Sequence, residues 1–137
     1  MKKYKEILKN EKAEIVRMSK VMESFCEAND LPMKAMFEIN LVLEEILMNI
    51  ISYGYDDDNE HEIVVQWWLS DNVLTLIITD DGKKFDPLII PEPELDKSVD
   101  ERKIGGLGIH LVKKMMCEIN YKRKDEENIL EMKKRIK

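Results

Sequence analysis

The sequence predicts an α+β fold, a two-layer sandwich in which helices cover one face of a mostly antiparallel sheet. Two long segments carry apolar residues at helical spacing, and two short segments with alternating apolar residues follow them. After a long irregular stretch come a third helical segment and two more strand-like segments. Because 137 residues suit one hydrophobic core, we assign residues 1–137 to a single domain.

Three helices are expected. The first covers residues 11–29, where one face is apolar, and Pro32 is well placed to begin the second at residues 33–53. The third follows a glycine-rich segment and runs to about Cys117. The apolar residues of the first helix that predict its buried face are Ile15, Met18, Met22 and Phe25.

Five strands are expected, and turns join two pairs of them. Residues 62–69 and 73–80 form a hairpin around Ser70-Asp71-Asn72. The last two strands are joined by a polar turn at residues 125–128. Trp67 and Trp68 must face opposite sides of the sheet, so only one of them belongs to the core. The remaining predicted strands are residues 3–9, 119–124 and 129–136.

Composition excludes several classes of protein. A net charge of -6 argues against a sequence-independent nucleic-acid binder, and no apolar run reaches the ~20 residues of a membrane span. Without a signal-peptide pattern or metal spacing at Cys26 and Cys117, we expect a cytoplasmic protein with reduced thiols. A basic cluster at residues 122–124 and 133–137 is either a solvated strand edge or a contact patch for an acidic partner.

The first candidate site is Glu45 with Asn49, four residues apart on the second helix and therefore on one face. A carboxylate can accept a proton from an attacking hydroxyl or water, and an amide oxygen can hold Mg²⁺. The simpler interpretation is a solvent-facing polar stripe. Glu44 is a second acidic candidate, but it points about 100° away around the helix, so the spacing to Asn49 favours Glu45.

The second candidate site is Asp80-Asp81-Gly82, at the end of strand 73–80. Side chains alternate along a strand, so Asp80 is in phase with Leu74, Leu76 and Ile78. If that row faces the helices, Asp80 is a buried carboxylate that needs a donor, and the exocyclic amine of adenine is one candidate. The alternative is an acidic turn that only ends the strand.

The third candidate site is the run Gly105, Gly106, Leu107 and Gly108, directly before the third helix. Glycines allow close backbone approach, and the free N–H groups of a helix N-terminus favour phosphate. The run is neither a P-loop nor a dinucleotide fingerprint. Its simpler interpretation is a glycine-rich helix start without a ligand.

In chain order these sites form an ExxxN helix, an Asp-x-Gly strand end, a long irregular segment and a glycine-rich helix start. This order resembles the N, G1 and G2 boxes of the GHKL ATPases, which have the Bergerat ATP-binding fold. Three segments look most like the anti-sigma-factor serine kinases, which phosphorylate a serine on an anti-anti-sigma (STAS) partner. They are EEILMNIISYGY (44–55), ITDDGKKFDP (78–87) and GGLGIHLVKKM (105–115).

The resemblance implies ATP and Mg²⁺, with Glu45 as general base and Asn49 as the Mg²⁺ ligand. By the same resemblance Asp80, with Gly82 beside it, binds adenine, while the glycines of 105–108 bind the phosphates. Residues 88–104 would form a lid over ATP. The implied partners are a STAS protein, a sigma factor and a second copy of the chain.

The sequence departs from the GHKL pattern at Lys84, which stands where many of these proteins have a second G1 glycine. This lysine either contacts phosphate or faces water. Arg102, Lys103 and Lys113 are candidates to neutralise the γ-phosphate, and Arg17 and Met18 are candidate partner contacts. Besides a kinase, the pattern allows a nucleotide-dependent module that sequesters a partner without phosphorylating it, and an ATP hydrolase.

Overall fold

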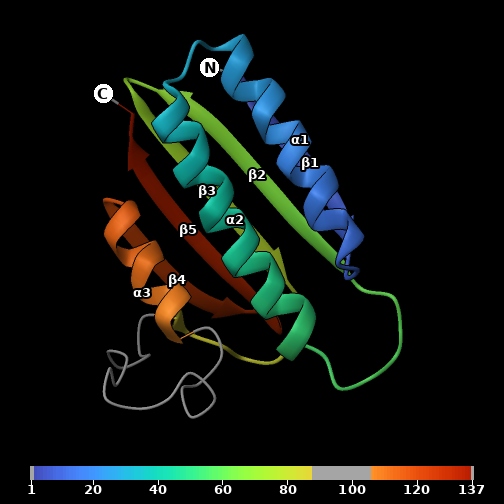
Figure 1. Ribbon diagram of the computed structural model, residues 1–137. Helices are drawn as coiled ribbons and strands as arrows, with labels where there is room; N and C mark the ends of the chain where they lie inside the picture. Colours follow the sequence, from blue (N-terminus) through green and yellow to red (C-terminus); the bar gives the residue numbers. More distant parts are fainter. Residues whose placement is uncertain (1, 88–105, 137) are drawn as a thin grey trace.

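The computed structural model describes residues 2–87 and 106–136. They form two layers, a five-stranded antiparallel sheet with helices on one face, as Figure 1 shows. The predicted α+β sandwich is therefore confirmed. Gly105 and the expected lid at residues 88–104 lie outside the described residues, as do Arg102 and Lys103.

The sheet has the strand order β1-β2-β3-β5-β4, and every neighbouring pair is antiparallel. Strand β3 therefore lies at the centre, between β2 and β5. This order pairs Asp80, the last residue of β3, directly with Asn128 of β5. The strands are β1 (Lys3–Lys9), β2 (Glu62–Ser70), β3 (Val73–Asp80), β4 (Glu118–Lys124) and β5 (Glu127–Arg135).

The helices within the described residues are α1 (Ala13–Ala28), α2 (Met33–Tyr53) and α3 (Gly106–Met115). Helix α2 crosses the middle of the sheet with α1 on one side and α3 on the other (Figure 1). The bounds of α2 are those that the sequence predicts, whereas α3 ends before Cys117. Within the described residues, no helix is both long and apolar enough to cross a membrane.

The core lies between the helices and the inner face of the sheet. Leu74, Leu76 and Ile78 are buried there, so this row of β3 is the one that faces the helices. Asp80 continues the row and is only 5% exposed. Trp67 is the core tryptophan and stacks on Tyr4, with ring centroids 5.5 Å apart.

The turn before β5 differs from the sequence prediction. Asp125 and Glu126 have positive φ values of 52° and 65°, so the chain reverses at these residues, in the left-handed conformation of tight hairpins. Strand β5 therefore begins at Glu127, and Asn128, predicted to lie in the turn, is a buried strand residue.

The basic cluster is not a uniform solvated face. Lys134 is 7% exposed, and its Nζ lies 3.2 Å from Glu38 Oε2 and 3.0 Å from the Met115 carbonyl. Arg123 donates from Nη1 to the Gly82 carbonyl at 2.7 Å. These two residues join secondary-structure elements because their long side chains reach acceptors on neighbouring segments.

The two candidate partner contacts on α1 also have internal roles. Met18 is fully buried in the core, so the expectation that it contacts a partner is wrong. Arg17 is partly exposed but donates to Glu14, Glu6 and the Ile7 carbonyl, which attaches α1 to β1.

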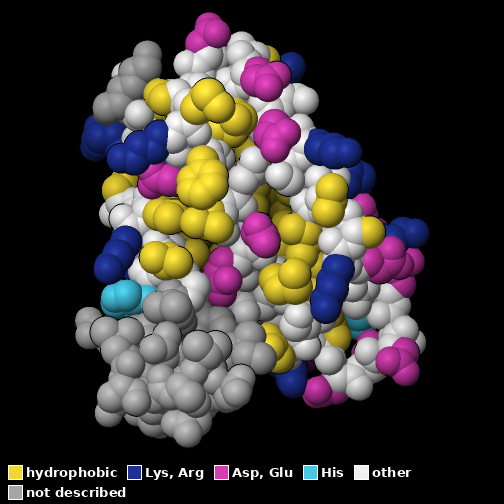
Figure 2. Space-filling model, in the orientation of Figure 1, with side chains coloured by type: hydrophobic (Ala, Val, Ile, Leu, Met, Phe, Trp, Pro, Cys, Tyr) yellow, Lys and Arg dark blue, Asp and Glu magenta, His cyan; other side chains and the backbone are white. Residues whose placement is uncertain are grey.

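Apolar side chains do reach the surface of the helical layer (Figure 2), and those of α1 and α2 include Val16, Met33 and Phe37.

Candidate functional site

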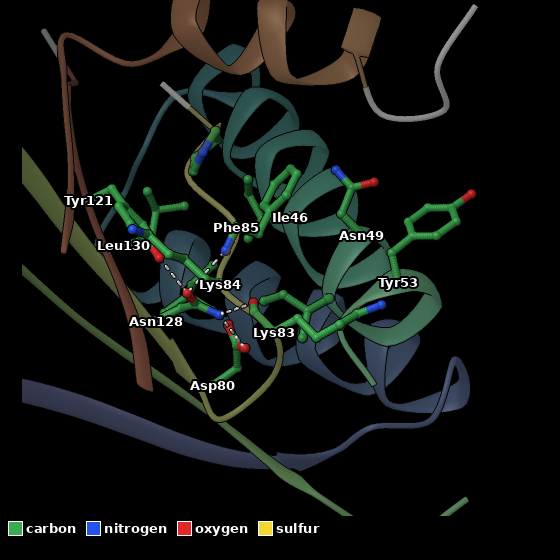
Figure 3. A pocket seen from close by; sticks show the side chains of 14 residues that line it. Ile46, Asn49, Tyr53, Asp80, Lys83, Lys84, Phe85, Tyr121, Asn128 and Leu130 are labelled. Carbon is green, nitrogen blue, oxygen red and sulfur yellow. Dashed lines mark hydrogen bonds between the residues drawn. The ribbon is translucent and has the colours of Figure 1, made fainter. Parts of the chain in front are cut away.

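A cavity of about 390 Å³ lies between α2, the end of β3 and the strands β5 and β4 (Figure 3). Its volume is in the range of small-molecule pockets. Asn49 and Asp80, predicted from separate motifs, both line it. The other lining residues are Ile46, Ile50, Tyr53, Gly54, Ile78, Lys83, Lys84, Phe85, Pro87, Tyr121, Asn128 and Leu130.

Asp80 is the buried acid of this cavity. Its Oδ1 accepts hydrogen bonds from the Gly82 backbone N–H at 2.8 Å and from Asn128 Nδ2 at 3.0 Å. Burial raises the pKa of the Asp80 carboxyl, and the two hydrogen bonds oppose that rise. The expectation of a buried carboxylate at the end of a buried row is confirmed.

Gly82 is required by the close approach of two other groups. A Cβ at this position would lie 2.8 Å from the Gly54 carbonyl oxygen and 2.9 Å from Asp80 Oδ1. The next residue, Lys83, donates its backbone N–H to the same Gly54 carbonyl at 2.8 Å. The loop after β3 is therefore fastened to the C-terminal end of α2, which closes one side of the cavity.

Glu45 and Asn49 share one face of α2, as predicted, but it is not a solvent-facing stripe, because Asn49 is buried and Glu45 is half-buried. Asn49 is 8% exposed and donates from Nδ2 to Glu45 Oε1 at 3.0 Å. Burial raises the pKa of the Glu45 carboxyl; the bond from Asn49 lowers it, and the nearby charge of Glu44 adds to the rise. Since the amide nitrogen is engaged with Glu45, the oxygen of Asn49 is the atom left for a ligand.

Gly108 in the first turn of α3 packs directly on the Glu45 carboxyl. A Cβ built on Gly108 would collide with the carboxyl carbon and both oxygens of Glu45. The two residues line a smaller hollow of about 130 Å³ beside α3. The structure thus brings together the first and third motifs of the sequence. Gly106 and Leu107 belong to the same helical turn.

Asn128 is the site residue that the sequence analysis missed. It is 6% exposed and contacts Asp80, the loop after β3 and Tyr121 of β4. A polar residue four positions after a basic strand is typical of a turn, and no local pattern marks it as buried. The only available signal was strand register, which depends on the exact length of the preceding turn.

The cavity fits a nucleotide base and a phosphate-bound magnesium ion. Its walls are apolar at Ile46, Ile78 and Leu130, while the Asp80 carboxylate is a polar acceptor at one end. Lys84 is exposed and also lines the cavity, so a phosphate contact and a solvent position both stay open for it. Mg²⁺ commonly uses few protein ligands together with phosphate oxygens, which the single amide oxygen of Asn49 would satisfy.

The sequence matches the family model described as a histidine kinase-like ATPase domain over residues 8–134. Among solved structures, the RsbU and RsbW domains of a Mycobacterium tuberculosis protein superpose with a TM-score of 0.73. That match has 12% sequence identity and covers 99% of this chain and 33% of the other. The likeness therefore shows a shared fold.

Three curated proteins illustrate the sequence relatives. The serine/threonine-protein kinase BtrW of Bordetella bronchiseptica is 30% identical over 94 residues, covering 69% of this chain and 66% of that protein. The serine-protein kinase RsbW of Bacillus velezensis is 26% identical over 60% of this chain and 54% of its own length. The anti-sigma F factor of Bacillus subtilis is 27% identical over 71% of this chain and 66% of its own length. The matches thus span less than two thirds of each relative.

Proposed function

This chain belongs to the family of histidine kinase-like ATPase domains, and from that premise we propose that it is an ATP-dependent protein-serine kinase acting as an anti-sigma factor. Its substrate is a serine of an anti-anti-sigma partner with a STAS domain, and it binds a sigma factor as a homodimer. The names of the relatives, two serine kinases and an anti-sigma factor, support this proposal.

One observation carries the kinase proposal. The Glu45 carboxyl is hydrogen-bonded to Asn49, which lines the cavity that also contains Asp80. A carboxylate able to accept a proton and an amide oxygen able to hold Mg²⁺ therefore lie one helical turn apart beside the cavity, which supports the proposal. Burial raises the pKa of Glu45 towards the working pH, where a carboxylate is a more effective proton acceptor.

In this proposal each site residue has one role. Asp80 accepts a hydrogen bond from the adenine amine, Asn49 Oδ1 holds Mg²⁺, and the first backbone N–H groups of α3 bind phosphate. Mg²⁺ supplies positive charge that neutralises the phosphate oxygens. Glu45 accepts the serine hydroxyl proton while the serine oxygen bonds to the γ-phosphorus and the bond to ADP breaks.

The test is the substitution Glu45→Gln, which keeps the shape of the side chain and removes the base. We expect serine phosphorylation of a purified STAS protein to fall by about 10²-fold or more. ATP affinity, measured by calorimetry, should stay within about threefold of the unsubstituted chain. Asn49→Ala is the companion variant, and it should remove the Mg²⁺ dependence of ATP binding.

Unchanged phosphorylation by Glu45→Gln would remove Glu45 from the role of base. If the unsubstituted chain binds ATP but phosphorylates no serine, the nucleotide-dependent binding module is the better account. If ATP does not bind at millimolar concentration, the nucleotide proposal itself fails. Phosphate released without a protein acceptor would instead indicate an ATP hydrolase.

A further inference from the structure

We propose that Asn128 is a positioning residue that sets the base specificity of the pocket, an inference that rests on the proposed nucleotide binding but not on the kinase step. Asn128 holds the Asp80 carboxylate so that one oxygen is occupied by internal donors and the other is left for the base. An exocyclic amine, as in adenine, is then accepted, whereas a carbonyl oxygen at the same ring position is rejected.

The hydrogen-bond partners fix the orientation of the Asn128 amide. Its Oδ1 faces two donors, the Tyr121 hydroxyl at 2.6 Å and the Phe85 backbone N–H at 3.3 Å. Its Nδ2 faces two acceptors, Asp80 Oδ1 at 3.0 Å and the Lys83 carbonyl at 2.8 Å. A flipped amide would place its oxygen against the two acceptors and its nitrogen against the two donors, so only this orientation satisfies all four groups.

The same contacts decide which oxygen of Asp80 is free. Oδ1 receives hydrogen bonds from Asn128 and from the Gly82 backbone. Within the described part of the chain, Oδ2 receives none. Figure 3 shows Asp80 beside Asn128 at the wall of the cavity, with the amide joined to one carboxylate oxygen. The other oxygen is the acceptor that a bound base can use.

Base selection follows because, among the described residues, the hydrogen-bond donors beside Asp80 are already engaged. The Asn128 amide protons are engaged by Asp80 and Lys83, and the Tyr121 hydroxyl donates to Asn128. A 6-oxo purine would bring its carbonyl against the Asp80 carboxylate, leaving two acceptors face to face. A site built around a hydrogen bond discriminates strongly against an analogue that cannot make it.

Other charged and titratable groups surround Asp80. Asp81 follows it in the chain, Arg123 of β4 donates to the Gly82 carbonyl, and Tyr55 lies close enough for the Asp80 charge to affect its hydroxyl. These groups are common to all the variants below. A change in pH dependence between variants therefore reports on position 128.

The decisive variant is Asn128→Asp, which keeps the shape and replaces the donating NH₂ with an oxygen. At about pH 8 two carboxylates face each other, and ATP affinity should fall about tenfold or more. At about pH 5.5 the two carboxyls share a proton, the donor to Asp80 is restored, and affinity should recover towards that of the unsubstituted chain. Preference for ATP over inosine triphosphate, which carries a 6-oxo group, should be reduced at the higher pH.

Asn120→Asp is the matched control. Asn120 lies exposed on β4, so this substitution makes the same amide-to-carboxylate change at a position away from Asp80. It should retain the ATP affinity, pH profile and base preference of the unsubstituted chain. Tyr121→Phe is a second test that removes one donor to the Asn128 oxygen and leaves the other. Its ATP affinity should fall about two- to fivefold.

The proposal is overturned if folded Asn128→Asp binds ATP normally at about pH 8. It is also overturned if the loss of affinity is equal for both nucleotides and does not depend on pH, because that pattern indicates a structural role only. If Asn128→Asp is unfolded, Tyr121→Phe with unchanged affinity and selectivity contradicts the proposal. Failure of the unsubstituted chain to bind ATP refutes the nucleotide site itself, whereas ATP binding without serine phosphorylation leaves this inference standing.

Discussion

The two acids of the site, Asp80 and Glu45, are held in different ways. Asp80 receives its hydrogen bonds from the loop that follows it and from Asn128, which is 48 positions away in the chain. Glu45 receives its hydrogen bond from Asn49, one turn along the same helix. The end of the site that contains Asp80 therefore depends on strand register, whereas the Glu45 end depends on local helix geometry and on the close approach of α3.

This difference predicts where each end is vulnerable. A substitution that moves α3 should impair the Glu45 end and leave base recognition intact. A substitution in the sheet near Asn128 should do the reverse. Three variants beyond those described above test the separation, and they follow in order of decreasing expected effect.

The largest effect is expected for Gly108→Ala. The added methyl group would collide with the Glu45 carboxyl, so serine phosphorylation should fall by about 10²-fold because a displaced catalytic group loses its alignment. Unfolding in urea should show a loss of at most about 1 kcal/mol, the low end for overpacking, because the Glu45 carboxyl is the far end of a flexible side chain and can move aside. The preference for ATP over inosine triphosphate should change little, because the contacts of Asp80 are untouched.

A double-mutant cycle with Glu45→Ala provides the control for Gly108→Ala. Without the Glu45 carboxyl the methyl group has space, so Gly108→Ala should cost little stability in that background. Equal stability losses in both backgrounds would show that the contact between Gly108 and Glu45 does not limit this position.

A smaller effect is expected for Lys134→Met, which keeps the apolar stem and removes the ammonium group. Glu38 and the Met115 carbonyl at the end of α3 would each lose a donor, costing roughly 1–3 kcal/mol of unfolding free energy in urea. Relative to the unsubstituted chain, Lys134→Met should increase the rate of backbone hydrogen exchange more in α3 than in β3. Uniformly faster exchange would contradict the idea that Lys134 fixes α3 in particular.

The smallest effect is expected for His61→Gln, at the outer side of the Asp80 end. His61 stacks on Tyr55 and contacts Asp57 at 2.8 Å and Asp81 at 3.3 Å. The hydrogen bond to Asp57 raises the pKa of His61 most, and the hydrogen bond to Asp81 adds a smaller increase. Protonated His61 therefore stabilises the fold below its ordinary pKa of about 6.5, and this contribution is lost as the pH rises through the higher folded value.

Thermal unfolding at two pH values checks this prediction. The unsubstituted chain should be more stable than His61→Gln at about pH 5.5, and the difference should shrink by about pH 8.5. A stability difference that grows with pH would contradict the assigned sign.

Much of the fold was predictable because its signals are local. Apolar residues at helical spacing predicted α2 with its observed bounds, and the alternating pattern of residues 73–80 predicted β3. The turn before β5 was placed wrongly because a polar run of Asp, Glu and Asn does not show how many of its residues reverse the chain. Because of that error, Asn128 was assigned to the turn and not to the buried strand position beside Asp80.

The parts of the candidate site that local patterns encode were also predictable from the sequence. Helix periodicity placed Glu45 and Asn49 on one face, and strand alternation placed Asp80 at the end of a row that turned out to be buried. The sequence could not decide which face of β3 met the helices. It also could not assign Lys134 and Arg123 to internal contacts, since a basic residue near the C-terminus looks the same whether it faces water or a neighbouring carbonyl.

The sequence by itself determined the helices and strands, the two-layer fold class and the motifs that contain Glu45, Asn49 and Asp80. Periodicity along the chain and spacing within a helix encode these features directly. Only the tertiary structure decided that Gly108 packs on Glu45 and that Asn128 holds Asp80. These contacts join residues far apart in the chain, and their formation depends on strand order, register and helix packing, which no local pattern specifies.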